Sequence, residues 1–327
     1  MDKVTKFFKS TAGMVLLVTI FVGIAVHITT GNFFTAYNIS TLTRAASFVI
    51  IVGFGQTIVL LTGGIDLSVA TIGSVCGMAS AIFMVDYGIH PYLAIVLASL
   101  IGIVLGGING FFIAYFKVTP FIVTLATMQI YKGIVYVITK GMPITGMPEA
   151  AESLANGVIG GILPNIVIIM IVICLLLTLM LKRTKLGRYI YALGGNRNCA
   201  KIVGIPTERI ELMVYCLSGW LAAIAGILMS CKLASFQASI GESWQMDSIT
   251  AAVLGGTSMA GGVGSVVGTI IGGILSSVIS TCITLLRISS YWETIVTGAV
   301  VLIAVLIDAI KDNPVIQSKI KRTLFGK

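Results

Sequence analysis

Long apolar runs occupy most of this chain, and only short polar segments separate them. A helix of about 20 mostly apolar residues is long enough to cross the hydrocarbon core of a bilayer. Charged residues make up 10% of the 327 residues and hydrophobic residues 57%, whereas soluble globular proteins carry roughly 25% charged residues. So few charges cannot cover a water-soluble particle of this size, which excludes a cytosolic enzyme, a secreted disulfide-rich domain and a disordered regulator. We therefore predict an all-α polytopic membrane protein that forms a single domain over residues 1–327.

The apolar runs predict about ten transmembrane helices, some of them short or broken by glycine. Their approximate bounds are 14–29, 45–62, 69–85, 92–116, 118–139, 163–181, 213–231, 249–260, 265–285 and 292–309. The run 249–260 is too short to cross a full bilayer alone, because a spanning helix needs at least about 17 residues.

The net charge of +9 is concentrated rather than spread along the chain. Fifteen of the 21 lysines and arginines lie at the N-terminus (Lys3, Lys6, Lys9), in the stretch 182–209 and in the tail 310–327. Loops on the cytoplasmic side carry an excess of basic residues. Even numbers of predicted helices separate the three clusters, so we predict that the stretch 182–212, the basic tail and both termini are cytoplasmic. A nucleic-acid-binding face is not expected, since the basic residues lie in tight clusters between long apolar runs rather than on one soluble face.

Two glycine-rich segments interrupt the helical pattern, at 62–68 and 255–264. Unwound backbone inside a membrane is tolerated where it is buried in protein or lines a wet cavity, and such interruptions point to a translocation path. We hypothesise a path or gate formed by Gly63, Gly64, Asp66, Ser68, Gly255, Gly256, Thr257 and Ser258. The alternative is that the small residues only let helices pack closely.

Asp66 admits two interpretations that do not exclude each other. As a cap, its carboxylate would accept a hydrogen bond from the amide of Ser68 or Val69 at the start of the next helix. As a functional group, it would bind the hydroxyl groups of a transported solute or hold the gate. Further polar residues within the predicted helices are candidates either for the path or for helix–helix hydrogen bonds: Gln56, Thr124, Thr127 and Gln129.

The stretch 182–212 reads as a basic linker, a Gly-Gly turn and a short helix. Asn196 suits the N-cap of that helix, Gly204 suits the left-handed position after its end, and Pro206 prevents its continuation. A helix of about two turns is marginal alone, so we predict that it docks into a partner groove. The alternative is a basic loop held near anionic lipid headgroups.

Residues for catalysis are scarce in this chain. The sequence contains no GxxxxGK[ST] phosphate-binding loop and no HExxH metal motif. The six cysteines lack CxxC spacing, and we interpret them as small buried hydrophobic residues. We therefore predict no enzyme activity, no cofactor and no metal site in this chain.

Several blocks in order resemble the ribose/galactoside-type sugar permeases of ABC importers. They are residues 62–69 (TGGIDLSV), 118–128, 187–196 (GRYIYALGGN), 246–269 and the pair Tyr291-Trp292. The resemblance implies a permease subunit in a bacterial inner membrane that moves a monosaccharide into the cytoplasm by alternating access. It also implies a permease homodimer in membrane lipid, a cytoplasmic ATPase that binds ATP and Mg, and an extracytoplasmic sugar-binding protein. A self-sufficient secondary carrier for a small polar solute remains the alternative, although acidic groups for ion coupling are sparse.

The resemblance also implies roles for individual residues. The coupling segment, which would contact the ATPase, comprises Gly187, Arg188, Gly194, Gly195, Asn196, Ala200 and Gly204. The related loop of other ABC permeases reads Glu-Ala-Ala-xxx-Gly, of which this chain keeps the final alanine and the glycine. Arg287 and Trp244 are candidates for docking the binding protein, and an interfacial aromatic belt is the alternative for Trp244. The sugar itself remains open between a pentose, a hexose, a sugar-like signal and a polyol.

Overall fold

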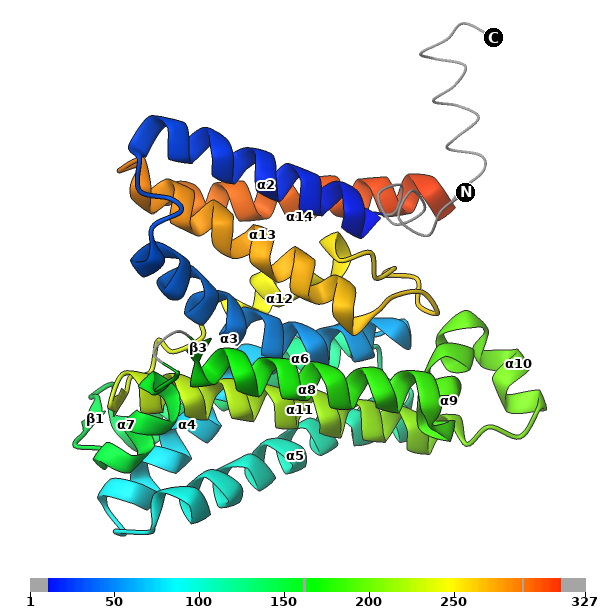
Figure 1. Ribbon diagram of the computed structural model, residues 1–327. Helices are drawn as coiled ribbons and strands as arrows, with labels where there is room; N and C mark the ends of the chain where they lie inside the picture. Colours follow the sequence, from blue (N-terminus) through cyan, green and yellow to red (C-terminus); the bar gives the residue numbers. More distant parts are fainter. Residues whose placement is uncertain (1–10, 161–162, 290, 313–327) are drawn as a thin grey trace, which may run out of the picture.

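The computed structural model describes residues 11–160, 163–289 and 291–312 (Figure 1). Lys3, Lys6, Lys9 and residues 313–327 of the basic tail lie outside the described residues. The helices are α2 Thr11–Thr30, α3 Ala36–Leu61, α4 Val69–Val85, α5 Pro91–Phe116, α6 Pro120–Thr139, α7 Glu149–Asn156, α8 Asn165–Arg183, α9 Lys185–Gly195, α10 Arg197–Ile202, α11 Thr207–Lys232, α12 Trp244–Leu254, α13 Val266–Leu285 and α14 Tyr291–Asp312. The strands are β1 Ile144–Thr145, β2 Val158–Ile159, β3 Leu163–Pro164 and β4 Ser235–Phe236.

The predicted all-α polytopic class is confirmed, while the predicted number of membrane crossings is met only in part. A helix lies at every one of the ten predicted positions. Within the described residues, seven helices are long and apolar enough to span a membrane: α2, α3, α5, α6, α8, α11 and α13. The prediction for 249–260 is the least accurate, because α12 lies over Trp244–Leu254 and the glycine-rich loop follows it.

Two buried helices, α3 and α11, form the centre of the bundle. The helix α11 packs against α3, α4 and α5. Gly219 of α11 faces Gly106 of α5, and Gly226 of α11 faces Gly73 of α4, so closely that a side-chain carbon at 219 or 226 would overlap the facing backbone. Lipid supplies no hydrophobic force between helices, and close backbone approach supplies dispersion contacts instead. At these positions the glycines serve helix packing.

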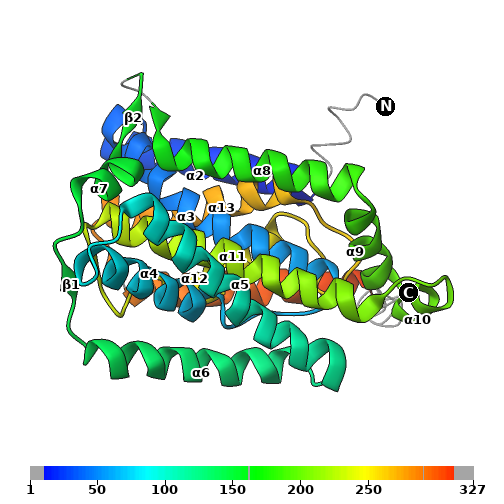
Figure 2. The same ribbon diagram turned by 90° about the horizontal axis from the view of Figure 1, so that it is seen from below.

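A second group of helices, α2, α13 and α14, covers one side of α3 (Figure 1). The hydroxyl groups of Thr57 in α3 and Thr269 in α13 are 2.5 Å apart and form a buried hydrogen bond between the two groups. Figure 2 shows α6 along the side of the molecule opposite α8, and α6 contacts α4 and α5. The bundle therefore has α3 in its interior, between α13 and α11.

The two ends of the bundle differ in structure. At one end, which we call the α7 end, β1 pairs with β4 in antiparallel register, β2 pairs with β3, and α7 packs beside α11. At the other end, the α10 end, α9 and α10 project from the bundle (Figure 1). The first residues of α2 and the last residues of α14 also lie at the α10 end (Figure 1).

Candidate translocation and coupling site

Three backbone segments far apart in sequence touch at the α10 end. The amide of Gly262 donates a hydrogen bond of 3.0 Å to the carbonyl of Leu61, the last residue of α3. Gly194, in the last turn of α9, faces the same carbonyl so closely that a side-chain carbon would overlap it. Gly261 packs against Gly194 and against the amide of Gly63. We call Leu61, Gly63, Gly194, Gly261 and Gly262 the glycine junction.

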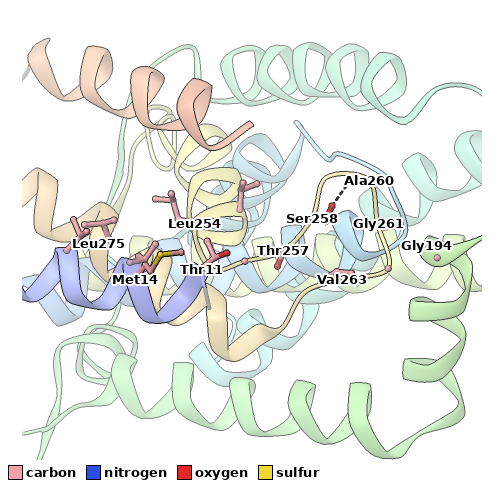
Figure 3. Close-up of a pocket in the computed structure, with 16 residues that line it drawn as sticks. Thr11, Met14, Gly194, Leu254, Thr257, Ser258, Ala260, Gly261, Val263 and Leu275 are labelled. Carbon is pink, nitrogen blue, oxygen red and sulfur yellow. Dashed lines mark hydrogen bonds between the residues drawn. The ribbon is translucent and has the colours of Figure 1, made fainter. Parts of the chain in front are cut away.

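A cavity of about 1000 Å³ lies beside the glycine junction (Figure 3). Its wall includes Gly194 and Gly195 of α9 and Gly256, Thr257 and Ser258 of the second glycine-rich segment. The first turns of α2, the end of α12 and part of α13 complete it. Residues predicted for coupling and residues predicted for the gate therefore line one cavity.

The loop after α12 is held in place by its own hydrogen bonds and by α9. The Ser258 amide donates to the Val263 carbonyl over 2.9 Å, which closes the loop on itself. The Tyr191 hydroxyl donates to the Gly264 carbonyl over 2.8 Å, which ties the loop to α9. Thr257 lines the cavity, and its buried hydroxyl has no hydrogen-bond partner among the described residues. A displacement of α9 would thus act directly on this loop.

Asp66 is fully buried at the centre of a polar network behind the junction. One carboxylate oxygen accepts hydrogen bonds from the Ser68 amide (3.0 Å) and the Ser68 hydroxyl (2.6 Å). The other accepts one from the Ser218 hydroxyl of α11 (3.0 Å). Asn109 of α5 donates to the Ser68 hydroxyl over 2.7 Å. The network fastens the start of α4 to α5 and α11, and the predicted bond to the Ser68 amide is present.

The segment before the coupling helix is a helix rather than a linker with a Gly-Gly turn. Thr184 caps α9 by accepting a hydrogen bond of 3.2 Å from the Gly187 amide. Ile190 and Leu193 are buried three residues apart, so one face of α9 packs on the bundle. The helix ends at Gly195, just before the N-cap of α10. The sequence signals for this helix were the N-cap residue Thr184 and the three-residue spacing of Ile190 and Leu193. The basic residues of the segment favoured a linker instead.

The short helix α10 has the predicted caps at both ends. Asn196 accepts a hydrogen bond of 3.0 Å from the Cys199 amide. At the other end Gly204 has a φ of 80°. The amide of Gly204 bonds to the Lys201 carbonyl and that of Ile205 to the Ala200 carbonyl, both over 3.0 Å, which is the Schellman arrangement. The predicted helix is correct, although it is only six residues long.

Charged side chains fasten α10 to α11. The two terminal guanidinium nitrogens of Arg197 each donate to one carboxylate oxygen of Glu211, at 2.9 and 2.6 Å. Glu211 is almost fully buried. Lys201 and Lys117 flank Glu208 at 3.2 and 3.0 Å. The planar two-point contact of Arg197 fixes orientation as well as distance, so α10 and the first turns of α11 should move together.

The remaining predicted coupling and gate residues pack within the bundle or face solvent. Gly255 meets Gly268 of α13 at close range, and Gly64 lies against the hydroxyl of Tyr215. Gly187 packs on the backbone of Leu181, whereas Arg188 is exposed. Gly64, Gly187 and Gly255 therefore serve packing, unlike the residues that line the cavity.

The two residues predicted to dock a binding protein differ in accessibility. Arg287 is exposed after the end of α13, at the α7 end. Trp244 is only 5% exposed and stacks on Phe48, with ring centroids 6.1 Å apart. The surface role expected for Trp244 is therefore wrong for this structure, because an aromatic ring at the start of a helix gives no sequence signal for the direction it faces.

The four polar residues predicted as candidates within helices have different surroundings in the structure. Thr124 bonds to the carbonyls of Pro120 and Ile65, and Thr127 to that of Val123, so both serve helix structure and packing. Gln56 is fully buried, and neither its amide nitrogen nor its oxygen has a partner among the described residues. Gln129 lines a second, smaller cavity.

Sequence reasoning missed Tyr191 and the pair Arg197–Glu211. The pair joins residues 14 apart across a turn, and only the position of Glu211 on the inner face of α11 could have indicated it. In the part of the chain that the structure describes, no group of three or more histidine, cysteine, aspartate or glutamate residues could hold a metal ion.

Comparisons with known proteins agree with this architecture. Residues 38–305 match the family model described as branched-chain amino acid transport system / permease component. The ribose import permease protein RbsC of Bacillus subtilis (strain 168) is 42% identical over 289 residues, which cover 87% of this chain and 88% of that relative. RbsC of Escherichia coli (strain K12) is 40% identical, covering 85% and 87%. The D-allose transport system permease protein AlsC of the same strain is 33% identical, covering 90% of each chain. No solved structure matches the chain.

The family match covers most of the chain, including nearly all of α3, both glycine-rich segments and the coupling segment. The relatives match over nearly their full length. The chain therefore belongs to the family of ABC importer permease subunits that includes the ribose import permeases.

Proposed function

We propose that this permease subunit moves a monosaccharide, ribose or a related sugar, into the cytoplasm by alternating access. The names of the relatives, which import ribose or D-allose, support a sugar as the solute. The chain is a multi-pass protein of the bacterial inner membrane. It has no phosphate-binding loop of its own, so the ATP and Mg that drive transport bind to a partner ATPase.

In this proposal the α10 end faces the cytoplasm. Seven lysines and arginines lie in the stretch 182–209, which includes α9 and α10, and basic residues gather on the cytoplasmic side of membrane proteins. The α7 end then faces the extracytoplasmic sugar-binding protein. Arg287, Tyr291 and Trp292 are exposed at that end and are the proposed contacts for it.

The ATPase docks on α10. The side chains of Ile202 and Val203 are 84% and 73% exposed, and adjoining exposed apolar side chains on a capped helix suit a groove in a partner. Arg197 and Glu211 transmit a displacement of α10 to α11. A permease homodimer in membrane lipid would present two such helices to a pair of ATPase subunits.

The observation that carries the proposal is the glycine junction. It places the backbone of α9 at Gly194, two residues before the N-cap of α10, against the end of α3 and the loop after α12. Closure of the ATPase would displace α10 and α9. The displaced α9 would then move the two glycine-rich segments and the wall of the large cavity, with the Asp66 network holding the start of α4 at the gate.

The test is reconstitution of the permease with its ATPase and binding protein in proteoliposomes. We expect sugar uptake that requires ATP, and we expect Ile202→Asp to reduce copurification of the ATPase at least several-fold, because a charge replaces an apolar contact. Ile130→Asn, on the exposed surface of α6, is the matched control and should leave copurification unchanged. Uptake driven by an ion gradient through this chain alone would show a secondary carrier instead.

A further inference from the structure

A second cavity, of about 170 Å³, lies between α4, α6, the loop before α12 and the start of α12. Six of the residues that line it are polar: Thr71, Ser74, Gln129, Lys132, Glu242 and Gln245. We call this cavity the α6 cleft. Polar and ionisable residues are costly within membrane-spanning helices and mark solute pathways there. Thr71, Ser74, Gln129 and Lys132 all lie within α4 or α6.

One buried hydrogen-bonding group in the α6 cleft, the hydroxyl of Ser74, is left without a partner in the described part of the chain. Ser74 is 5% exposed, and its hydroxyl has no partner among the described residues. Leaving a buried hydroxyl unpaired costs free energy that a ligand hydroxyl would recover. Gln129 and Gln245 contribute amide groups that can each donate and accept. A solute with several hydroxyl groups would match this set.

The ion pair at the cleft limits the charge of the solute. The Lys132 ammonium lies 3.1 Å from a carboxylate oxygen of Glu242. Lys132 is in the middle of α6, a helix long and apolar enough to span the membrane. The two side chains are 45% and 69% exposed and their charges sum to zero, so the pair gives the cleft no net charge to balance a phosphate or an ammonium group. The cleft therefore suits a neutral solute.

The volume of the α6 cleft limits the size of the solute. A cavity of about 150 Å³ holds one benzene ring, so about 170 Å³ suits one sugar ring rather than two. One wall of the cleft is the first turn of α12, and the last residue of α12 adjoins Gly255. A shift of the second glycine-rich segment would therefore be carried along an 11-residue helix to the cleft.

We propose that the α6 cleft binds one neutral monosaccharide ring during its passage through the permease, with Ser74, Gln129 and Gln245 bonding to its hydroxyls. This inference rests on the proposed function, since it assigns a place in this chain for the transported sugar. A site of this kind makes the permease itself selective for neutral sugars of one ring, in addition to any selection by the binding protein.

The first test measures sugar uptake and ATP hydrolysis in the reconstituted complex, with saturating binding protein and whichever of D-ribose, D-allose or D-xylose the wild type imports. We expect Ser74→Ala and Gln129→Ala each to lower the number of sugars imported per ATP about three- to tenfold, as loss of one hydrogen bond predicts. Ser80→Ala in α4, whose hydroxyl bonds to Gly77 instead, and Ile130→Ala in α6 are the matched controls and should leave the ratio unchanged.

The second test probes occupancy directly. In a Cys199→Ser background, which removes the exposed cysteine, Gln129→Cys should react with a neutral thiol reagent. Millimolar amounts of the transported sugar should slow the reaction at least threefold, and the sugar phosphate should not. Ile130→Cys is the control, because its side chain faces outward and does not line the cleft.

The outcomes separate this inference from the proposed function. Unchanged ratios in both variants, or equal protection of Gln129→Cys and Ile130→Cys, would overturn the α6 cleft as a sugar site while wild-type uptake still supported an ATP-driven importer. Failure of the wild-type complex to import any of the three sugars with ATP would instead overturn the proposed function, and the sugar assigned to the cleft with it.

Discussion

At the scale of single residues, Gly194 occupies the most restricted position in the coupling segment. Its Cα faces the Leu61 carbonyl with no space for a side-chain carbon, whereas the neighbouring Gly195 has open space around it. We expect Gly194→Ala to destabilise the protein by about 1–3 kcal/mol, the usual cost of overpacking, and to uncouple ATP hydrolysis from transport. Thermal unfolding and the ratio of sugar to ATP measure the two effects.

Gly195→Ala is the control for that prediction. It lies in the same helix turn and should be neutral or slightly stabilising, because alanine favours helix more than glycine does. Equal behaviour of the two variants would contradict the close contact at the glycine junction.

Asp66 shows how far residue-level prediction reaches. The bond to the Ser68 amide was predictable, because an aspartate two residues before the N-cap of a helix can accept from local amides. The bond to Ser218 was not, because those residues are 152 positions apart and only the packing of α11 brings them together. The surface role predicted for Trp244 was wrong for the same reason, because its stacking partner Phe48 lies on another helix.

The Asp66 network leads to a second prediction. In Asp66→Asn an NH₂ group replaces one oxygen, so one of the three donors at the carboxylate loses its acceptor. We expect a loss of stability of about 1–3 kcal/mol, seen as a lower thermal midpoint, together with reduced transport. A variant with wild-type stability and full transport would contradict both the network and the gate role proposed for Asp66.

At the scale of elements, the end of α10 depends on the left-handed conformation of Gly204. A β-branched residue is strained there, whereas asparagine tolerates this region. We expect Gly204→Val to unwind the end of α10 and to reduce ATP-coupled transport several-fold without loss of membrane insertion. Gly204→Asn should retain most of the coupling, so equal loss in both variants would argue against a conformational cause.

The helices were more predictable than the connections between them. Long apolar runs located the membrane helices because lipid requires them, and the run 69–85 coincides with α4. The end of α12 was misplaced because Val253, Leu254 and the small residues after them continue the apolar pattern although the backbone turns at Gly255. The strands β1 to β4 were not predictable, since each has only two residues and therefore no periodicity.

At the scale of the whole molecule, the proposed orientation makes native Cys199 a cytoplasmic marker. Cys199 is exposed on α10, contrary to the burial predicted for all six cysteines, whereas Cys216 is half-buried and Cys76, Cys174, Cys231 and Cys282 are buried. We expect a membrane-impermeant maleimide to label the protein in inverted membrane vesicles and not in intact spheroplasts, and Cys199→Ser to abolish most of that labelling.

Met142→Cys provides the opposite marker. Met142 is 68% exposed in the connection between α6 and β1, at the α7 end. In the Cys199→Ser background it should be labelled in intact spheroplasts. Labelling of both positions from the same side would contradict the assignment of the two ends.

The glycine junction has a consequence for exchanging parts between permeases. Its contacts are between main chains, so they depend on the absence of side chains and hardly on which side chains surround them. A foreign segment spanning 185–205 should therefore fit this bundle if it keeps the glycine at 194 and a partner for Glu211. Grafts of that kind would redirect the permease to another motor subunit while its solute route stayed unaltered.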